Sequence, residues 1–182
     1  MMIIVEGPDN SGKSTLINQL GKDFGIKLIE PVSHGPVKGF KDLYDRTNGL
    51  IKRAISNHTN KIIVDRISLI SEPIYGTICR NKNLWKLSPK DEEKFWKVLD
   101  ILDCIYIYCR PDDNIVLSMR THQIKDYDTP VHLKALKENQ QRIVEAYDKY
   151  FSSFTRPYFK YNYNKESSYR DLTNFIKEHI KW

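Results

Sequence analysis

The sequence predicts a three-layer α/β domain, in which a parallel sheet of five strands lies between two layers of helices. Short apolar runs alternate with longer amphipathic segments along the chain, which is the pattern of a parallel sheet joined by helices. The strand-like runs are apolar throughout, as strands covered on both faces must be. No internal repeat, low-complexity tract or long linker divides the 182 residues, so we expect one domain over residues 1–182.

The first half of the chain contains three predicted strands. Residues 2–5 form the first, which breaks at Gly7 and Pro8 before helical spacing resumes at Lys13. Gly25 ends that helix. The elements that follow are a second strand at 26–29, a Gly- and Pro-rich loop at 31–39, a helix at 40–55 with a kink near Gly49, and a third strand at 61–65.

The second half adds two strands and five helices. Helical spacing runs from Ser68 to about Arg80. Ser88-Pro89-Lys90-Asp91 indicates a helix start, because Ser caps helices, Pro suits the first helical position and acids favour the first turn. The remaining elements are a strand at 105–108, a helix opening at 111–113, a polar loop at 121–129, a long helix at 131–151, a last strand at 158–161 and a last helix at 169–180.

Composition limits the class of protein. Of the residues, 40% are hydrophobic and 29% are charged, and no apolar run reaches the roughly 18 residues of a membrane span. The N-terminus lacks the basic region and cleavage site of a signal peptide, and the three cysteines are expected to be reduced thiols of a cytoplasmic protein. The net charge of +6 is spread along the chain, so we expect small polyphosphate substrates and no stable nucleic-acid or membrane partner.

The segment Gly7-Pro8-Asp9-Asn10-Ser11-Gly12-Lys13-Ser14 matches the phosphate-binding pattern G-x-x-x-x-G-K-[ST]. Its glycines let backbone N–H groups converge on phosphate oxygens, and the following helix directs its positive dipole end at the anion. Lys13 places a positive charge beside the β- and γ-phosphates, and Ser14 offers a hydroxyl to Mg²⁺. We therefore expect ATP and Mg²⁺ to be bound through Gly7, Asn10, Ser11, Gly12, Lys13, Ser14 and Thr15.

Five segments resemble the thymidylate kinases, and they occur in that family's order. The stretch 5–16 is similar to the family's hydrophobic-E-G-x-D-x-x-G-K-S/T-T. The later segments are Glu30-Pro31, Asp65-Arg66 with Ser71 and Tyr75, Pro111-Asp112 with Arg120, and Val144-Glu145-Ala146-Tyr147. The resemblance covers roughly residues 2–150. It implies a P-loop kinase fold that transfers the ATP γ-phosphate to a deoxynucleoside monophosphate, and the short chain looks like a viral (phage) member.

Three residues in or beside the phosphate loop are candidates for metal and substrate binding. Asp65 ends a predicted strand next to the loop, where its carboxylate can hold Mg²⁺ or the water molecules bound to it. Arg66 can fork onto phosphate oxygens of the donor or the acceptor. The resemblance implies that Asp9 contacts the 3′-hydroxyl of the acceptor sugar; a local turn contact is the other interpretation.

Aromatic residues supply the other substrate candidates. Tyr75 is expected beneath the sugar, where it would leave no room for a 2′-hydroxyl, and Phe40 and Tyr44 are expected to stack on the base. Ordinary core packing explains Tyr75 equally well, and it is the favoured interpretation of Phe40 and Tyr44. The expected substrate-binding residues are Asp9, Glu30, Phe40, Tyr44, Arg66, Tyr75 and Tyr127.

A lid is expected at about 118–130. Charge on the transferring phosphoryl group must be met by a cation beyond the loop lysine. Some thymidylate kinases carry an Arg in the loop directly after the Asp, whereas this chain has the uncharged Asn10 there. We therefore expect Arg120 first and Lys125 second to supply this charge, with Arg66 or Arg142 as the next candidates.

Departures from the family pattern fall on the acceptor side. Ile29 replaces the Arg that precedes Glu-Pro, the spacing from Asp65 to Tyr75 is about one residue longer, and the loop 32–39 differs. Phosphoryl transfer is still expected, while the base and the oligomeric state, for which a homodimer is one option, are left open.

Two other functions are compatible with the motif. Glu30-Pro31-Val32 resembles the E-P-V of deoxynucleoside kinases, in which the Glu acts as general base on a 5′-hydroxyl. Asp9 and the Asp65-Arg66-Ile67 segment argue against that family. A P-loop ATPase or switch that acts on a partner is the second alternative; a GTPase would need N-K-x-D, and the segment 81–84 lacks the final Asp.

Overall fold

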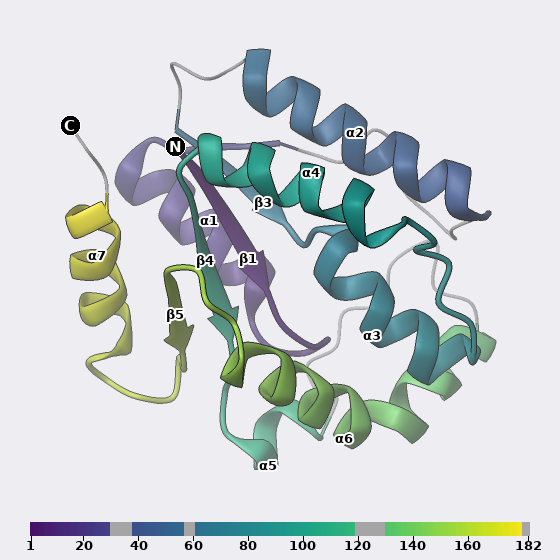
Figure 1. Ribbon diagram of the computed structural model, residues 1–182. Helices are drawn as coiled ribbons and strands as arrows, with labels where there is room; N and C mark the ends of the chain where they lie inside the picture. Colours follow the sequence, from purple (N-terminus) through teal and green to yellow (C-terminus); the bar gives the residue numbers. More distant parts are fainter. Residues whose placement is uncertain (30–37, 57–60, 119–129, 180–182) are drawn as a thin grey trace.

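The computed structural model describes residues 1–29, 38–56, 61–118 and 130–179, and these form the predicted α/β fold (Figure 1). Five strands pair in parallel in the order β2-β3-β1-β4-β5, which confirms the predicted sheet. The strands are β1 (Met2–Glu6), β2 (Lys27–Leu28), β3 (Ile62–Asp65), β4 (Cys104–Cys109) and β5 (Tyr158–Tyr161).

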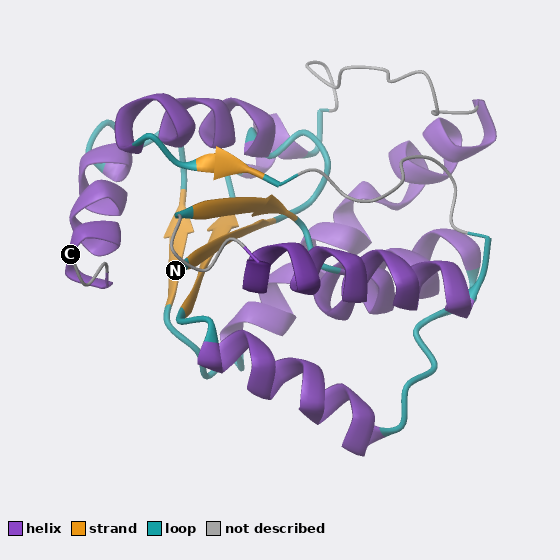
Figure 2. Cartoon of the chain, turned by 90° about the horizontal axis from the view of Figure 1, so that it is seen from above, coloured by secondary structure: helices purple, strands orange, loops and turns teal. Residues whose placement is uncertain are grey.

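Helices cover both faces of the sheet (Figure 2). They are α1 (Lys13–Phe24), α2 (Phe40–Ser56), α3 (Ser68–Arg80), α4 (Pro89–Ile101), α5 (Asp113–Val116), α6 (Pro130–Ser152) and α7 (Ser168–His179). Alternate residues of β1 enter two separate cores, because successive side chains of a strand point to opposite faces. Ile3 and Val5 pack with α1 and α7, whereas Met2 and Ile4 pack with α2, α3, α4 and α6.

The element boundaries differ from the predicted ones in a few places. The second strand is shorter than expected, although Ile29 still donates its N–H to the Ile63 carbonyl at 2.9 Å. Helix α2 runs through Gly49 as one uninterrupted helix. The helix expected at 111–113 is the single turn α5, and the polar loop 121–129 lies outside the described residues. Ser88 caps α4 as predicted, since its side-chain oxygen accepts the Asp91 N–H at 3.2 Å.

None of the described helices is long and apolar enough to cross a bilayer. The three cysteines, Cys79, Cys104 and Cys109, are free thiols, as the sequence predicts.

Parallel pairing brings the functional ends of two strands together. Val5 of β1 lies beside Asp65 of β3, and Glu6 lies beside Tyr108 of β4. The phosphate loop leaves β1 at this carboxyl-terminal edge, where open α/β sheets bind their ligands. Helix α6 supports the same edge through its buried face.

An aromatic stack joins α6 to the sheet. The ring of Phe151 lies 4.5 Å from the ring of Tyr108 at an interplanar angle of 4°, and Phe151 is only 2% exposed. Tyr147, one turn earlier on α6, lies 6.0 Å from the same Tyr108 ring. These contacts hold α6 against β4.

We therefore expect Phe151→Ala to lower the free energy of unfolding by about 3–5 kcal/mol, the usual cost of removing a buried aromatic ring. Val131→Ala is the matched control, because Val131 lies on the same helix and is 79% exposed. Urea unfolding followed by circular dichroism measures both variants. A loss below about 1 kcal/mol for Phe151→Ala would show that the stack does not hold the helix.

Candidate active site

Two glycines of the phosphate loop have no space for a side chain. Gly7 has φ +143°, and a Cβ atom there would come within 2.5 Å of the Cys109 carbonyl oxygen. Gly12 has φ +80°, and a Cβ atom would come within 2.9 Å of the Tyr163 ring. Positive φ and close approach each favour glycine, so the geometry of the loop explains both residues.

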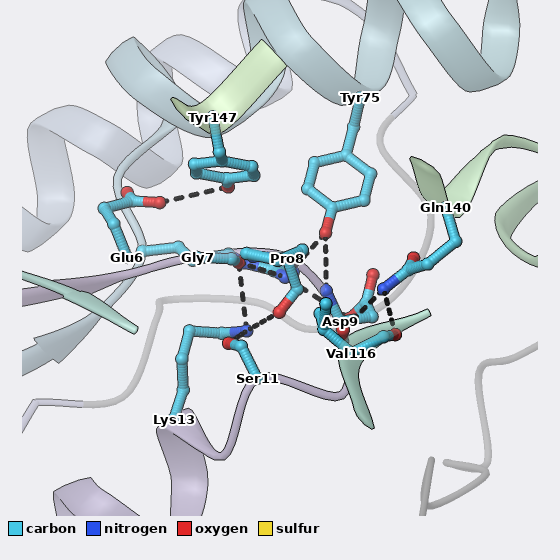
Figure 3. Close-up of polar contacts among 11 residues, drawn as sticks. Glu6, Gly7, Pro8, Asp9, Ser11, Lys13, Tyr75, Val116, Gln140 and Tyr147 are labelled. Atoms are coloured by element: carbon cyan, nitrogen blue, oxygen red, sulfur yellow. Dashed lines mark hydrogen bonds and ion pairs between the residues drawn. The ribbon is translucent and has the colours of Figure 1, made fainter. Parts of the chain in front are cut away.

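The Lys13 side chain turns back over the loop. Its Nζ donates hydrogen bonds to the carbonyl oxygens of Gly7 at 3.1 Å and Pro8 at 2.7 Å (Figure 3). Burial and the nearby Arg66 lower the pKa of Lys13 to about 8. The ammonium group is therefore poorly compensated for a buried charge, and a polyphosphate anion beside it would raise its pKa back toward the usual value.

A cavity of about 530 Å³ lies along this loop. Its lining contains nine of the predicted site residues, namely Asp9, Asn10, Ser11, Gly12, Lys13, Ser14, Thr15, Asp65 and Arg66. Leu16, Gln19, Tyr161 and Tyr163 complete the lining. The tertiary structure thus brings six of the seven predicted nucleotide residues, both predicted metal residues and two of the predicted acceptor residues, Asp9 and Arg66, to one cavity.

Ser14 and Asp65 border the cavity as a candidate Mg²⁺ site. The Oδ1 atom of Asp65 is buried and has no hydrogen-bond partner among the described residues, although a buried carboxylate oxygen normally has one. The described residues contain no group of three or more His, Cys, Asp and Glu side chains that could hold a metal ion. One carboxylate and one hydroxyl fit Mg²⁺, which takes its other ligands from water and substrate phosphates.

Asp9 and Arg66 form a polar cluster with Tyr75 on the other side of the loop. Arg66 donates to the Gly7 carbonyl at 2.8 Å, to the Tyr75 hydroxyl at 2.8 Å and to the Asp9 carboxylate at 3.3 Å. Tyr75 is 8% exposed, and its hydroxyl also accepts the Asp9 N–H at 2.9 Å. Tyr75 is thus part of the protein core and also a direct partner of Asp9.

Arg66 adopts an uncommon backbone conformation, with φ 64°. A non-glycine residue in this region is strained by its Cβ atom, and such residues concentrate at functional sites. The N–H of Arg66 donates to the Val5 carbonyl at 2.9 Å, and the next N–H, of Ile67, donates to Glu6 Oε1 at 2.7 Å. These hydrogen bonds hold the turn that directs the guanidinium group to the cavity.

Glu6 is buried directly beneath the loop. Its Oε2 atom accepts a hydrogen bond from the Tyr147 hydroxyl of α6 at 3.1 Å (Figure 3). Burial raises the pKa of Glu6 to about 7, although the Ile67 N–H and the positive charges of Arg66 and Lys13 act in the opposite direction. The carboxyl group therefore titrates near neutral pH.

Phe40 and Tyr44 do not line the cavity at the phosphate loop. The Phe40 ring lies 6.3 Å from Trp85, and the Tyr44 ring lies 5.6 Å from Phe95, in a separate aromatic cluster. This placement agrees with the packing interpretation, and stacking on a base stays a prediction. Glu30, Arg120, Lys125 and Tyr127 lie outside the described residues, so their expected roles also stay predictions.

The sequence predicts no role for four residues of the site: Glu6, Gln140, Tyr147 and Tyr163. Glu6 is a charged residue at the end of an apolar run, and Gln140 interrupts the buried stripe of α6 formed by Leu136, Ile143, Tyr147 and Phe151. These local patterns indicate that a polar side chain is buried, but they do not identify its hydrogen-bond partner. Tyr163 has no local signal, because only the fold places it on Gly12.

Comparison with known proteins supports the fold. No protein-family model and no curated protein matches the sequence. The structure is similar to YorR from Bacillus subtilis in complex with phosphorylated GDP, with a TM-score of 0.64, 17% identity and 100% coverage of both chains.

Two further solved structures share the fold. A deoxyadenosine kinase from M. mycoides with the products dCMP and dCDP bound has a TM-score of 0.59 and 20% identity, over 99% of this chain and 100% of that chain. Thymidylate kinase from Candida albicans has a TM-score of 0.58 and 15% identity, over 98% and 93%. At these identities the similarity shows the three-layer α/β fold of these P-loop kinases over nearly the whole chain.

The raised pKa of Glu6 predicts a pH dependence of stability. An unfolded Glu ionises near pH 4.5, whereas the folded carboxyl group keeps its proton to about pH 7. Raising the pH through this interval therefore lowers the free energy of unfolding, in total by about 3 kcal/mol. Glu6→Gln cannot ionise, so the difference in stability between wild type and Glu6→Gln should change by that amount.

Urea unfolding of both proteins between pH 4.5 and pH 8 measures the difference, and titrating groups that do not interact with Glu6 contribute equally to the two curves. Parallel stability curves for wild type and variant would show that the Glu6 carboxyl group has an ordinary pKa.

Proposed function

We propose that the protein is a phosphotransferase that moves the γ-phosphoryl group of ATP, with Mg²⁺, to a deoxynucleoside monophosphate. The observation that carries the proposal is the shared cavity at the phosphate loop. Lys13, the Asp65 carboxylate with its unpartnered Oδ1, and the Asp9–Arg66 pair all border it. Groups for the donor, the metal ion and an anionic acceptor are thus combined in one place.

The donor phosphates fit the loop itself. The helix α1 begins at Lys13 and directs its N-terminal dipole end toward the loop. Ser14 and Asp65 would hold Mg²⁺, whose positive charge would offset that of the donor phosphates. Tyr163, which is 41% exposed beside Gly12, offers an aromatic surface for the nucleoside of the donor.

The acceptor side favours an anion over a neutral hydroxyl. The Arg66 side chain is 25% exposed at the cavity, and its one described carboxylate partner is Asp9, at 3.3 Å. A monophosphate is already an anionic nucleophile that needs a cation nearby, whereas a nucleoside hydroxyl benefits from a general base. Arg66 supplies the cation within the described part of the chain. Glu30, the proposed base of the alternative reaction, lies outside it.

In this reaction an oxygen of the acceptor phosphate forms a bond to the γ-phosphorus as the bond to the β–γ bridging oxygen breaks. ADP leaves, and a nucleoside diphosphate is formed. Lys13 would donate hydrogen bonds to the β- and γ-phosphate oxygens, and Arg66 would hold the attacking phosphate. Arg120 and Lys125 of the expected lid are proposed to add positive charge, as predicted from the sequence.

The decisive experiment measures ADP release from Mg-ATP with each deoxy- and ribonucleoside monophosphate and each free nucleoside. Chromatography of the products identifies the phosphorylated acceptor. We expect turnover with one or more deoxynucleoside monophosphates. Turnover with nucleosides alone would favour the nucleoside kinase, and hydrolysis that no small acceptor stimulates would favour an ATPase.

Lys13→Ala should lower kcat for phosphoryl transfer by about 100-fold or more, because it removes a buried positive charge from the transferring phosphates. Lys22→Ala is the matched control, since Lys22 lies exposed near the end of the same helix. Steady-state kinetics compares both with wild type, and circular dichroism verifies the fold. Activity of Lys13→Ala within about tenfold of wild type would contradict the assignment of this loop.

Asp9→Asn should raise the KM for the acceptor by about tenfold or more and leave the KM for ATP nearly unchanged, because it removes charge and one side of the Arg66 pair while keeping the shape. Initial rates with each substrate varied in turn separate the two constants. An effect on the ATP KM alone would place Asp9 in the metal site and weaken the case for a monophosphate acceptor.

A further inference from the structure

Asp9 is restrained by a different element at each of its polar groups. Its N–H donates to the Tyr75 hydroxyl of α3 at 2.9 Å, and its carboxylate pairs with Arg66 after β3 at 3.3 Å. Its carbonyl oxygen accepts a hydrogen bond from Gln140 of α6 at 2.7 Å (Figure 3). Tyr75 and Arg66 were candidates from the sequence, whereas the contact with Gln140 joins residues that are 131 positions apart.

The Gln140 side chain forms hydrogen bonds to two backbone carbonyl groups. Its Nε2 group donates to the carbonyl oxygens of Asp9 at 2.7 Å and Val116 at 3.1 Å. Both partners are acceptors, so the donor end of the amide must face them. The Gln140 side chain therefore joins the tip of the phosphate loop to the end of α5.

A second amide makes the same connection. Asn10 donates from Nδ2 to the carbonyl oxygen of Ile115, also at the end of α5, at 2.8 Å. Asn10 has φ 64°, so the backbone reverses its course directly after the Asp9 carbonyl. The orientation of the Asp9–Asn10 peptide and the conformation of the loop tip thus depend on two side-chain amides.

The other end of the Gln140 amide has no benefit for the fold. Gln140 is 2% exposed, and its Oε1 atom is buried without a hydrogen-bond partner among the described residues. A buried carbonyl oxygen without a partner lowers stability. An apolar residue of similar size would fit the stripe of α6 but would leave the Asp9 and Val116 carbonyl oxygens without this donor, so the glutamine serves the loop contact and not the packing of the helix.

We propose that Gln140 is a positioning residue of the reaction, which holds the Asp9 peptide so that the Asp9 carboxylate meets the acceptor. The inference rests on the proposed function for its effect on turnover. Its structural half, the restraint on the loop, can be measured without any acceptor.

Gln140→Met tests the proposal, because methionine keeps the approximate length and loses the donor. Gln141→Met is the matched control: Gln141 is the next residue of α6, is exposed, and bonds to Glu145 at 3.0 Å. If Gln140→Met does not fold, Gln140→Asn, which withdraws the amide by one methylene, carries the same expectation.

Two measurements are made on each full-length variant. Hydrogen–deuterium exchange of the peptide that contains residues 7–12 should become about fivefold faster or more in Gln140→Met, and stay unchanged in Gln141→Met. Acceptor kcat/KM should fall by about 10- to 100-fold in Gln140→Met, since small displacements of positioning groups have effects of this size. The KM for ATP should stay within about threefold of wild type.

Unchanged exchange of the loop in Gln140→Met, or equal changes in the two variants, would overturn the proposal whatever the function is. Faster exchange with wild-type kinetics would overturn the positioning role. If the wild type phosphorylates no acceptor, the proposed function fails, and exchange alone then decides whether Gln140 restrains Asp9.

Discussion

The carboxylate of Glu6 has no exposed surface, and its two oxygens join three elements at the end of the central strand. One oxygen accepts the Ile67 N–H at the start of α3, and the other accepts the Tyr147 hydroxyl of α6. The rest of the site depends on this interaction. It holds the left-handed turn at Arg66, and that turn places the guanidinium group against Gly7 and Asp9.

Helix α6 has a double role in this arrangement. Its apolar residues fill the core against β4, where Phe151 stacks on Tyr108. Two of its buried polar residues, Gln140 and Tyr147, bond to the first part of the phosphate loop at Asp9 and to Glu6 at the end of β1. The helix directly follows the segment 119–129 in the chain, which lies outside the described residues.

Several buried polar groups of the site lower the stability of the folded protein. Burial moves the pKa of Glu6 up to about 7 and that of Lys13 down to about 8, and Asp65 Oδ1 lacks a described partner. A metal ion and phosphate oxygens would complete the contacts of Lys13 and Asp65. Charged groups held in place without their ligands lower the free energy of unfolding. This loss of stability is commonly found where charges are preorganised for catalysis.

The sequence by itself determined the sheet, the phosphate loop and the residues beside it, because each of these has a local signature. The spacing of hydrophobic residues and the turn residues between them identify strands and helices. Gly7 and Gly12 are required by the backbone geometry of a single loop. Asp65 and Arg66 were predictable because parallel pairing brings the end of β3 next to β1. Only the tertiary structure decided the partners of Glu6 and Gln140 and the position of Tyr163. It also placed Phe40 and Tyr44 in a separate aromatic cluster. A side chain's type and period show that it is buried, but its hydrogen-bond partner depends on which distant segments pack together.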